Sequence, residues 1–212
     1  MELPATNLTL FLTATLVLLL TPGPAVLYIV ARSVDQGRRA GLVSVLGIEA
    51  GNLFHAVAAG LGVSAILLTS ALAFDIVKYL GAAYLIYLGI RTLTTPLPAQ
   101  QPDALEKKSL RRIFSQAVVV AILNPKTALF FFAFLPQFVD PSQGGAPLQL
   151  LALGLIFVTL ATVTDGLYAL AAGTAGRWLR GSRQFLRFQR YFAGTVYIGL
   201  GLAAAFTGSD KQ

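Results

Sequence analysis

The side chains that could do chemistry in this chain are polar or ionisable groups placed inside otherwise apolar segments. A charge in the hydrocarbon of a membrane costs about 2.5–3.5 kcal/mol or more, so such groups face a bundle interior or a water-filled cavity. A set of this kind can bind a small charged substrate or carry protons. Its members are Glu49, Asn52, His55, Asn124, Lys126, Asp165 and Tyr168.

Two helix breaks interrupt the apolar segments at comparable depth. The first is Pro22-Gly23-Pro24, and the second is Asn124-Pro125-Lys126 within the apolar run 113–135. A proline removes one backbone donor and clashes with the carbonyl one turn back, so each break ends or kinks its helix. We expect the two breaks to form a binding site near the membrane midplane.

The breaks and the charges together predict a site for a zwitterion. The N-terminus of a half-helix has unpaired N–H groups and a partial positive charge, which attract a carboxylate. The carboxylate of Asp165 would in turn attract an ammonium group, so a free amino acid fits better than a sugar or a metal ion. We also predict that Lys126 and Asp165 interact, and that Asp165 is the main candidate for proton coupling.

Two residues of the polar set and one pair of glycines leave alternatives open. Glu49 lies about two turns inside the Arg38 end of its helix, where a long side chain also reaches interfacial water. His55 is the only histidine, and its unperturbed pKa of about 6.5 suits proton exchange, although a lone histidine is more often a packing residue. Gly47 and Gly51 form a GxxxG pair, which serves either packing within the bundle or a homo-oligomer.

The composition is that of an integral membrane protein. Of 212 residues, 56% are hydrophobic and 12% are charged, and the mean hydropathy is +0.72. Soluble domains have about 25% charged residues. The absence of cysteine excludes a disulfide framework, a thiol relay and a Cys-ligated metal site. We expect no cofactor and no bound metal.

The basic residues predict the orientation in the membrane. The net charge is +7, and most of the sixteen Lys and Arg residues lie in the segments 32–39, 91–112 and 177–190. This is the positive-inside pattern, which places the three segments in the cytoplasm. No basic–aromatic motif accompanies the charge, so nucleic-acid binding is not expected.

The apolar runs predict one all-α transmembrane domain, 1–212, with six transmembrane helices. The first repeat, 5–93, has spans at 5–31, 42–67 and 76–93, with a cytoplasmic loop at 32–41. A cytoplasmic linker follows at 94–112. The second repeat, 113–208, has spans at 113–135, 148–173 and 191–206, with an outer loop at 136–147 and both termini outside. The segment 177–190 is expected to be an interfacial helix anchored by Trp178, Leu179, Phe185, Leu186 and Phe188.

Internal similarity indicates that the two halves are copies of one unit. HAVAAG at 55–60 matches YALAAG at 168–173, and KYLGAAYLIYLGI at 78–90 matches RYFAGTVYIGLGL at 190–202. A unit of three helices enters the membrane inverted in its second copy, and inverted repeats with broken helices are typical of alternating-access transporters. Under this duplication Asn52 falls opposite Asp165, and His55 falls opposite Tyr168.

Four motifs together are similar to one known family. They are Pro-Gly-Pro late in the first span, KYLGAAYLIYLGI in the third, NPKTALFFFAFLPQF at 124–138, and an Asp followed by a Tyr in the fifth. With these motifs, nearly the whole chain resembles the lysine exporter family, in particular its homoserine/threonine-efflux branch of bacterial amino-acid exporters. The residues that match the family pattern are Pro22, Gly23, Pro24, Asn124, Pro125, Lys126 and Asp165, whereas Glu49 and His55 lie outside it.

The resemblance implies a secondary transporter in the bacterial cytoplasmic membrane. It would export homoserine- or threonine-like, or other neutral or basic, amino acids from the cytoplasm, driven by the proton-motive force, with protons and the lipid bilayer as its other partners. The competing class is an intramembrane enzyme that uses Asp165, Glu49 and His55. The sequence has no His-Glu-x-x-His motif and no Gly-x-Gly-Asp around Asp165, which argues against that class.

Overall fold

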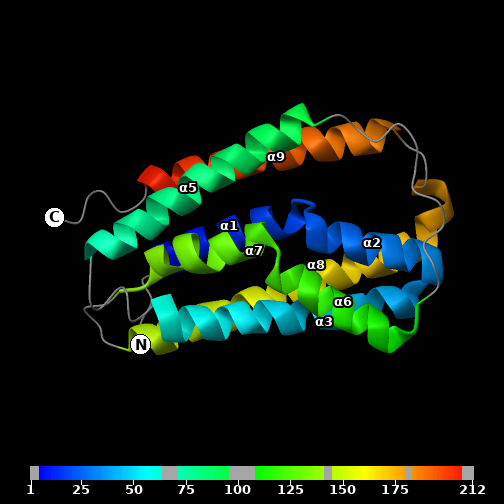
Figure 1. Cartoon of the computed structure of the whole chain (residues 1–212), viewed down its shortest axis with the longest axis horizontal. Coiled ribbons are helices and arrows are strands. Elements are labelled where there is room, and N and C mark those ends of the chain that lie inside the picture. Colours follow the sequence, from blue (N-terminus) through cyan, green and yellow to red (C-terminus); the bar gives the residue numbers. More distant parts are fainter. Residues whose placement is uncertain (1–4, 64–70, 96–107, 141–144, 180–182, 207–212) are drawn as a thin grey trace.

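The structure is a computed structural model that describes residues 5–63, 71–95, 108–140, 145–179 and 183–206. Within these ranges every regular element is a helix, which confirms the all-α prediction for the described part of the chain. The helices form an elongated bundle and run mostly along its long axis (Figure 1).

The first broken helix consists of α1 (Ala5–Leu20) and α2 (Pro24–Gln36). Only Gly37 separates α2 from α3 (Arg38–Ala58), which ends in a π-helical turn, η1 (Ala59–Val63). The predicted loop at 32–41 is therefore wrong. Gly37 has a φ of 82°, which glycine adopts without steric cost, so a single residue suffices to reverse the chain between the two helices.

The second broken helix follows α5 (Ala71–Thr94). It consists of α6 (Leu110–Ile122), α7 (Pro125–Leu129), the π-helical η2 (Phe130–Phe134) and the 3-10 helix η3 (Leu135–Phe138). The axis bends by 46° between α6 and the part that begins at Pro125. The proline break predicted at this position is confirmed.

Two long helices complete the chain, α8 (Ala146–Leu179) and α9 (Arg183–Phe206). The prediction of a separate interfacial helix at 177–190 is wrong, because its described residues form the end of α8 and the beginning of α9. The proposed anchors Trp178, Leu179, Phe185, Leu186 and Phe188 have side chains that lie outside the described part of the structure.

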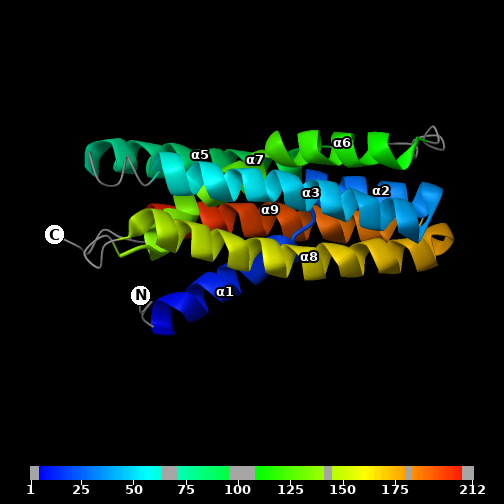
Figure 2. The ribbon, with the colours of Figure 1, turned by 90° about the horizontal axis from the view of Figure 1, so that it is seen from below.

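The helices pack in two groups. In the first, α3 packs against α6 and α8, and α2 packs against α3 and α8; in the second, α5 packs against α9 (Figures 1 and 2). Gly47 of α3 faces α6, where an added Cβ would lie 2.5 Å from the Phe114 carbonyl oxygen. The GxxxG pair thus serves packing within the chain, and a homo-oligomer stays a prediction.

Phenylalanines hold the second half of the α6–α7 helix in place. The ring of Phe130 lies 6.2 Å from that of Phe11 in α1 and 4.8 Å from that of Phe157 in α8. Phe131 packs on the same ring of Phe157 at 4.9 Å. These contacts fix the position of α7, and therefore of Lys126, relative to α1 and α8.

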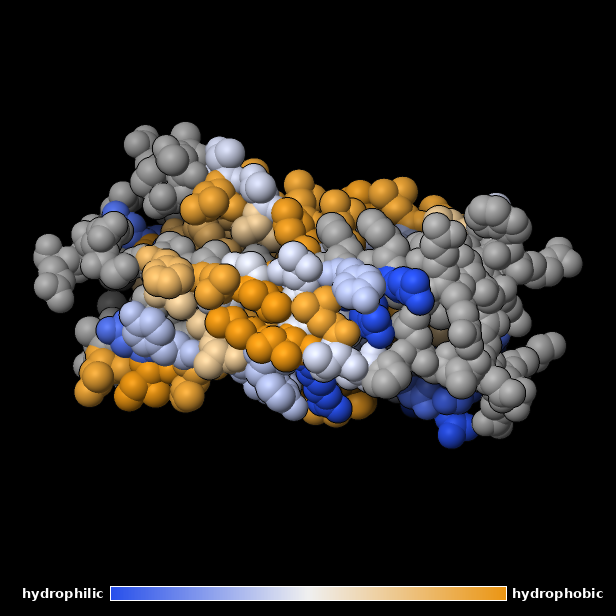
Figure 3. All heavy atoms as spheres, turned by 90° about the horizontal axis from the view of Figure 1, so that it is seen from above, coloured by the Kyte–Doolittle hydropathy of each residue, from blue (hydrophilic) through white to orange (hydrophobic). Residues whose placement is uncertain are grey.

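Two described segments are long and apolar enough to cross a membrane, Pro24–Gly62 and Ala146–Thr174. The bent pair formed by α6 and 125–138 adds a third if it is one span, and Leu8–Leu20 is a shorter apolar helix. Large apolar side chains lie exposed along the bundle, among them Leu72, Leu80 and Phe206, and Figure 3 shows extended apolar areas on one face. Such a surface suits contact with lipid. The six spans in two inverted repeats stay a prediction.

Candidate functional site

The two helix breaks lie beside each other in the middle of the bundle. The helix pairs α1–α2 and α6–α7 run in opposite directions along the long axis, each with its break near the centre (Figure 1). Lys126 connects them: its Nζ donates to the carbonyl oxygens of Leu18 at 3.1 Å and Thr21 at 2.8 Å. The residues at the two breaks therefore form one polar centre, and Lys126 is only 5% exposed in it.

The local geometry explains why a lysine fits at this point. The carbonyls at the end of α1 have no following helical turn to pair with, and they carry the partial negative charge of a helix C-terminus. The Leu18 carbonyl accepts from the Thr21 N–H at 3.1 Å and has a second lone pair to offer. An ammonium group satisfies both requirements. Lys126 is held in register by Asn124, whose side-chain oxygen accepts a hydrogen bond from the Lys126 backbone N–H at 3.2 Å and caps α7.

Asp165 on α8 is close enough to Lys126 to interact with it electrostatically, and the predicted pairing of the two side chains stays a prediction. Among the described residues the interaction is not a direct ion pair, because the hydrogen bonds of the Lys126 ammonium group go to backbone carbonyls. Asp165 is 4% exposed. One turn further along α8, the Tyr168 hydroxyl donates to the Leu20 carbonyl oxygen at 2.9 Å, so α8 also contacts the end of α1.

A second carboxyl group, that of Glu49 on α3, lies against Asp165. The two carboxyl groups are close enough to interact electrostatically. Asn52, one turn along α3, donates from Nδ2 to Glu49 Oε2 at 2.9 Å. Two carboxylates close together in a buried site repel each other unless one of them holds a proton. Glu49 is 7% exposed, which places it in the interior and not at interfacial water.

Several buried polar atoms in this centre have no partner among the described residues. They include Asn124 Nδ2, Asn52 Oδ1, Glu49 Oε1 and Thr15 Oγ1. More than about nine in ten buried polar groups in proteins form hydrogen bonds, so a group of exceptions in one region needs an explanation. A bound polar molecule that pairs with these donors and acceptors would explain the exceptions.

Gly23 lies between the two prolines of the first break. Because it has no side chain, Lys126 and Tyr197 of α9 can approach the backbone closely at this point. A Cβ added at Gly23 would lie 3.0 Å from Tyr197 Oη and 3.3 Å from Lys126 Nζ. The Tyr197 hydroxyl donates to the Pro22 carbonyl oxygen at 3.4 Å, and Tyr197 is 3% exposed. A side chain at this position would therefore have to displace Tyr197 or Lys126 slightly.

The sequence analysis missed Tyr197. The available signal was a tyrosine hydroxyl near the middle of the apolar span 191–206. In the match between 78–90 and 190–202, Tyr197 falls opposite Leu85, and Leu85 also lies beside Lys126. The space between Leu18, Leu85, Lys126 and Phe130 is too narrow for a water molecule, so the structure leaves no room for a substrate on this side of Lys126.

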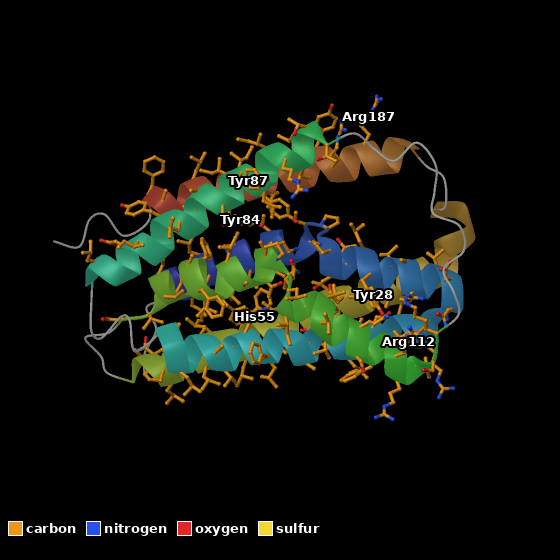
Figure 4. All side chains as sticks on the ribbon, viewed as in Figure 1. Tyr28, His55, Tyr84, Tyr87, Arg112 and Arg187 are labelled. Carbon is orange, nitrogen blue, oxygen red and sulfur yellow. The ribbon has the colours of Figure 1, made fainter. Side chains whose placement is uncertain are left out.

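His55 lies at the end of α6 and not at the carboxyl pair. Its Nε2 is 3.2 Å from the Ala121 carbonyl oxygen, and its ring stacks on that of Phe131 at 5.9 Å. Figure 4 shows His55 in the interior, between α3 and the second broken helix. This geometry favours the packing alternative over proton handling.

Comparison with known proteins places these residues in a family context. Residues 16–208 match the family model described as LysE type translocator. The chain is 32% identical over 194 residues to a homoserine/homoserine lactone efflux protein of Salmonella typhimurium, with 92% of this chain and 93% of that protein covered. It is 31% identical over 195 residues to an uncharacterized membrane protein of Vibrio cholerae, with 92% and 94% covered. No solved structure matches the chain significantly.

Proposed function

Because the chain belongs to the family of LysE type translocators, we propose that it exports small amino acids from the cytoplasm across the bacterial inner membrane. The family is one of transporters and not of enzymes, so the alternative of an intramembrane enzyme is set aside. Homoserine and related neutral amino acids are the first substrates to test, since the Salmonella typhimurium relative is named for homoserine and homoserine lactone efflux.

The observation that carries the proposal is the meeting of a lysine, two helix breaks and a carboxyl pair at one buried point. The N-terminus of α2 begins at Gly23 and Pro24, and no side chain caps it. Its N–H groups and Asn124 Nδ2 are donors for a substrate carboxylate. Glu49 and Asp165 supply the negative charge for its ammonium group. Both ends of a zwitterion are thereby recognised.

Proton coupling follows from competition for the carboxyl pair. When Glu49 and Asp165 share a proton, their negative charge is reduced and an ammonium group is held less strongly. When the pair loses that proton, a substrate ammonium group replaces it. Suppose that the site releases substrate on one side of the membrane, binds a proton there and releases that proton on the other side. Each transport cycle then exchanges one substrate for one or more protons. We propose that this competition is the basis of antiport.

Equivalent helix contacts in the two halves support an inverted repeat. A Cβ added at Gly89 of α5 would lie 2.7 Å from the carbonyl oxygen of Gly194 in α9. One added at Gly201 of α9 would lie 2.8 Å from the carbonyl oxygen of Ala82 in α5. Gly89 and Gly201 are equivalent in the match between 78–90 and 190–202, and so are Ala82 and Gly194. Each contact is therefore the symmetry counterpart of the other.

A second pair of contacts follows the same rule between α3 and α8. A Cβ added at Gly154 would lie 2.7 Å from Ala56 Cβ, and one added at Gly41 would lie 3.1 Å from Ala169 Cβ. The match of HAVAAG with YALAAG makes Ala56 equivalent to Ala169 and Gly41 equivalent to Gly154. Both contacts thus support two inverted three-helix units. We propose that these units move against each other to open the site alternately to each side.

The test of the proposed function is efflux of labelled amino acids. Proteoliposomes loaded with labelled homoserine, threonine or lysine should lose label faster with this protein than without it, and fastest when a pH gradient drives protons inward. Growth of a transporter-deficient strain on toxic amino acids and analogues would extend the substrate panel. If no substrate of the panel leaves faster than from empty liposomes, amino-acid export is refuted.

A further inference from the structure

A cleft of about 700 Å³ lies between α2 and the first turns of α6, away from Lys126. Four cations line it: Arg32 from α2, and Lys108, Arg111 and Arg112 at the beginning of α6. None of its described lining residues is acidic. Figure 4 shows Tyr28 and Arg112 at this end of the molecule.

Hydrogen bonds between the two helices hold the walls of the cleft in place. Gln36, at the end of α2, donates from Nε2 to the Lys108 carbonyl oxygen at 2.9 Å and accepts from the Lys108 backbone N–H at 3.0 Å. Tyr28 donates to the Ile113 carbonyl oxygen at 3.1 Å. Lys108 Nζ donates to the neutral Gln116 at 2.9 Å, so this contact orients its charge without neutralising it. The cationic walls are therefore preorganised.

One face of α6 changes from basic to apolar along its length. Arg111, Ser115 and Val119 follow each other at intervals of four residues along one exposed stripe of α6, and Leu123 continues this stripe just past the end of the helix. Val119 is 54% exposed and Leu123 is 74% exposed. The cleft thus has cations at its end, and exposed apolar surface extends toward the middle of the bundle from Val119 to Leu123, over about 6 Å.

We propose that this cleft binds an anionic phospholipid, with its phosphate among the cations and an acyl chain along Val119 and Leu123. Basic pockets between transmembrane helices bind acidic head groups, and arginine binds phosphate oxygens with two N–H groups at once. The apolar surface decides against the transported amino acid as occupant, because a zwitterion has neither a net charge for four cations nor a chain to cover Leu123. The proposal does not depend on the identity of the substrate.

The test is lipid binding by the full-length protein, measured by native mass spectrometry in detergent with phosphatidylglycerol and phosphatidylcholine of equal chain length. Phosphatidylglycerol should bind at least about tenfold more tightly. Arg111→Gln with Arg112→Gln should weaken its binding by about 25-fold, since each cation near an anionic lipid contributes about fivefold. The matched control is Arg39→Gln with Arg187→Gln, which removes two exposed charges outside the cleft and should leave binding unchanged.

Four results would overturn the proposal. Equal binding of the two lipids would mean that the cations select no head group. Equal weakening of phosphatidylglycerol binding in both double variants would mean that the binding depends on the overall charge of the protein and not on the cleft. Equal competition by glycerol phosphate without acyl chains would identify a site for a free anion. Disulfide cross-linking of Val119→Cys to a second copy of the chain in lipid-free detergent would identify the face as a subunit interface.

Discussion

Gly23→Ala tests whether the first break, Lys126 and α9 form one packed unit. The new methyl group would lie 3.0 Å from Tyr197 Oη and 3.3 Å from Lys126 Nζ. Both contacts are tighter than ordinary van der Waals contact, so one of the two side chains must move by a few tenths of an ångström. Tyr197 is 3% exposed, and Lys126 would lose hydrogen bonds of 2.8 and 3.1 Å to the end of α1.

The magnitude follows from the cost of overpacking. Inserting a methyl group into a packed interior destabilises a protein by about 1–3 kcal/mol. The backbone of Gly23 has a φ of −129°, which alanine adopts without strain, so the whole effect comes from the contacts. A misplacement of about 1 Å in a site can lower a rate by about a hundredfold, so a shift of a few tenths of an ångström in the groups that bind substrate should lower efflux severalfold.

The assay combines thermal unfolding in detergent with labelled-substrate efflux from proteoliposomes. Gly23→Ala should lower both. The second variant, Gly23→Ala with Tyr197→Phe, removes the nearest atom and should recover part of the stability. The control is Gly166→Ala, adjacent to Asp165, where an added Cβ meets no atom within 4 Å and stability should rise by about 0.5–1 kcal/mol. Unchanged stability and efflux in Gly23→Ala would refute the packing argument.

Three further predictions concern charge, histidine and topology. Lys126→Met should lower the yield of folded protein, because it removes the donor of the Thr21 carbonyl, at a cost of about 1–3 kcal/mol, and one of the two donors of the Leu18 carbonyl; a folded yield equal to wild type would contradict this. His55→Phe should destabilise the protein in thermal unfolding but keep gradient-driven efflux per folded molecule, and loss of the gradient dependence alone would reassign the proton to His55. A single cysteine at position 108 should react with an impermeant reagent only from the cytoplasmic side, and one at position 210 only from outside; the reverse labelling would overturn the proposed orientation.

The sequence predicted the positions of both breaks because proline removes a donor wherever a helix places it. The predicted pairing of Lys126 with Asp165 stays a prediction, although both side chains are buried. The sequence did not predict the hydrogen-bond partners of Lys126, since these are backbone carbonyls of α1, and residue types carry no signal for them. Tyr197 was missed for a related reason: its role depends on the close approach of α9 to Gly23, which is a property of packing.

The helix α2 extends beyond its predicted end because a charged residue was interpreted as part of a solvated loop. Arg32 suggested a solvated loop at 32–41, yet it is a helical residue with 4% exposure, and its guanidinium lies 5.6 Å from the centre of the Tyr28 ring. A long amphipathic side chain can be buried along its stem and held by an aromatic ring. The chain reversal depends on Gly37 instead.

The central claim is that substrate and proton compete for the Glu49–Asp165 carboxyl pair. Asp165→Asn tests it most directly, because the amide keeps the shape of the side chain and removes its titration, while Glu49 remains to hold the substrate ammonium group. The measurement is flux of labelled homoserine in proteoliposomes, once under a pH gradient and once at equal pH with substrate on both sides. The account predicts that uphill, gradient-driven transport is lost while slow exchange continues. Uphill transport that still depends on the pH gradient in Asp165→Asn would contradict it.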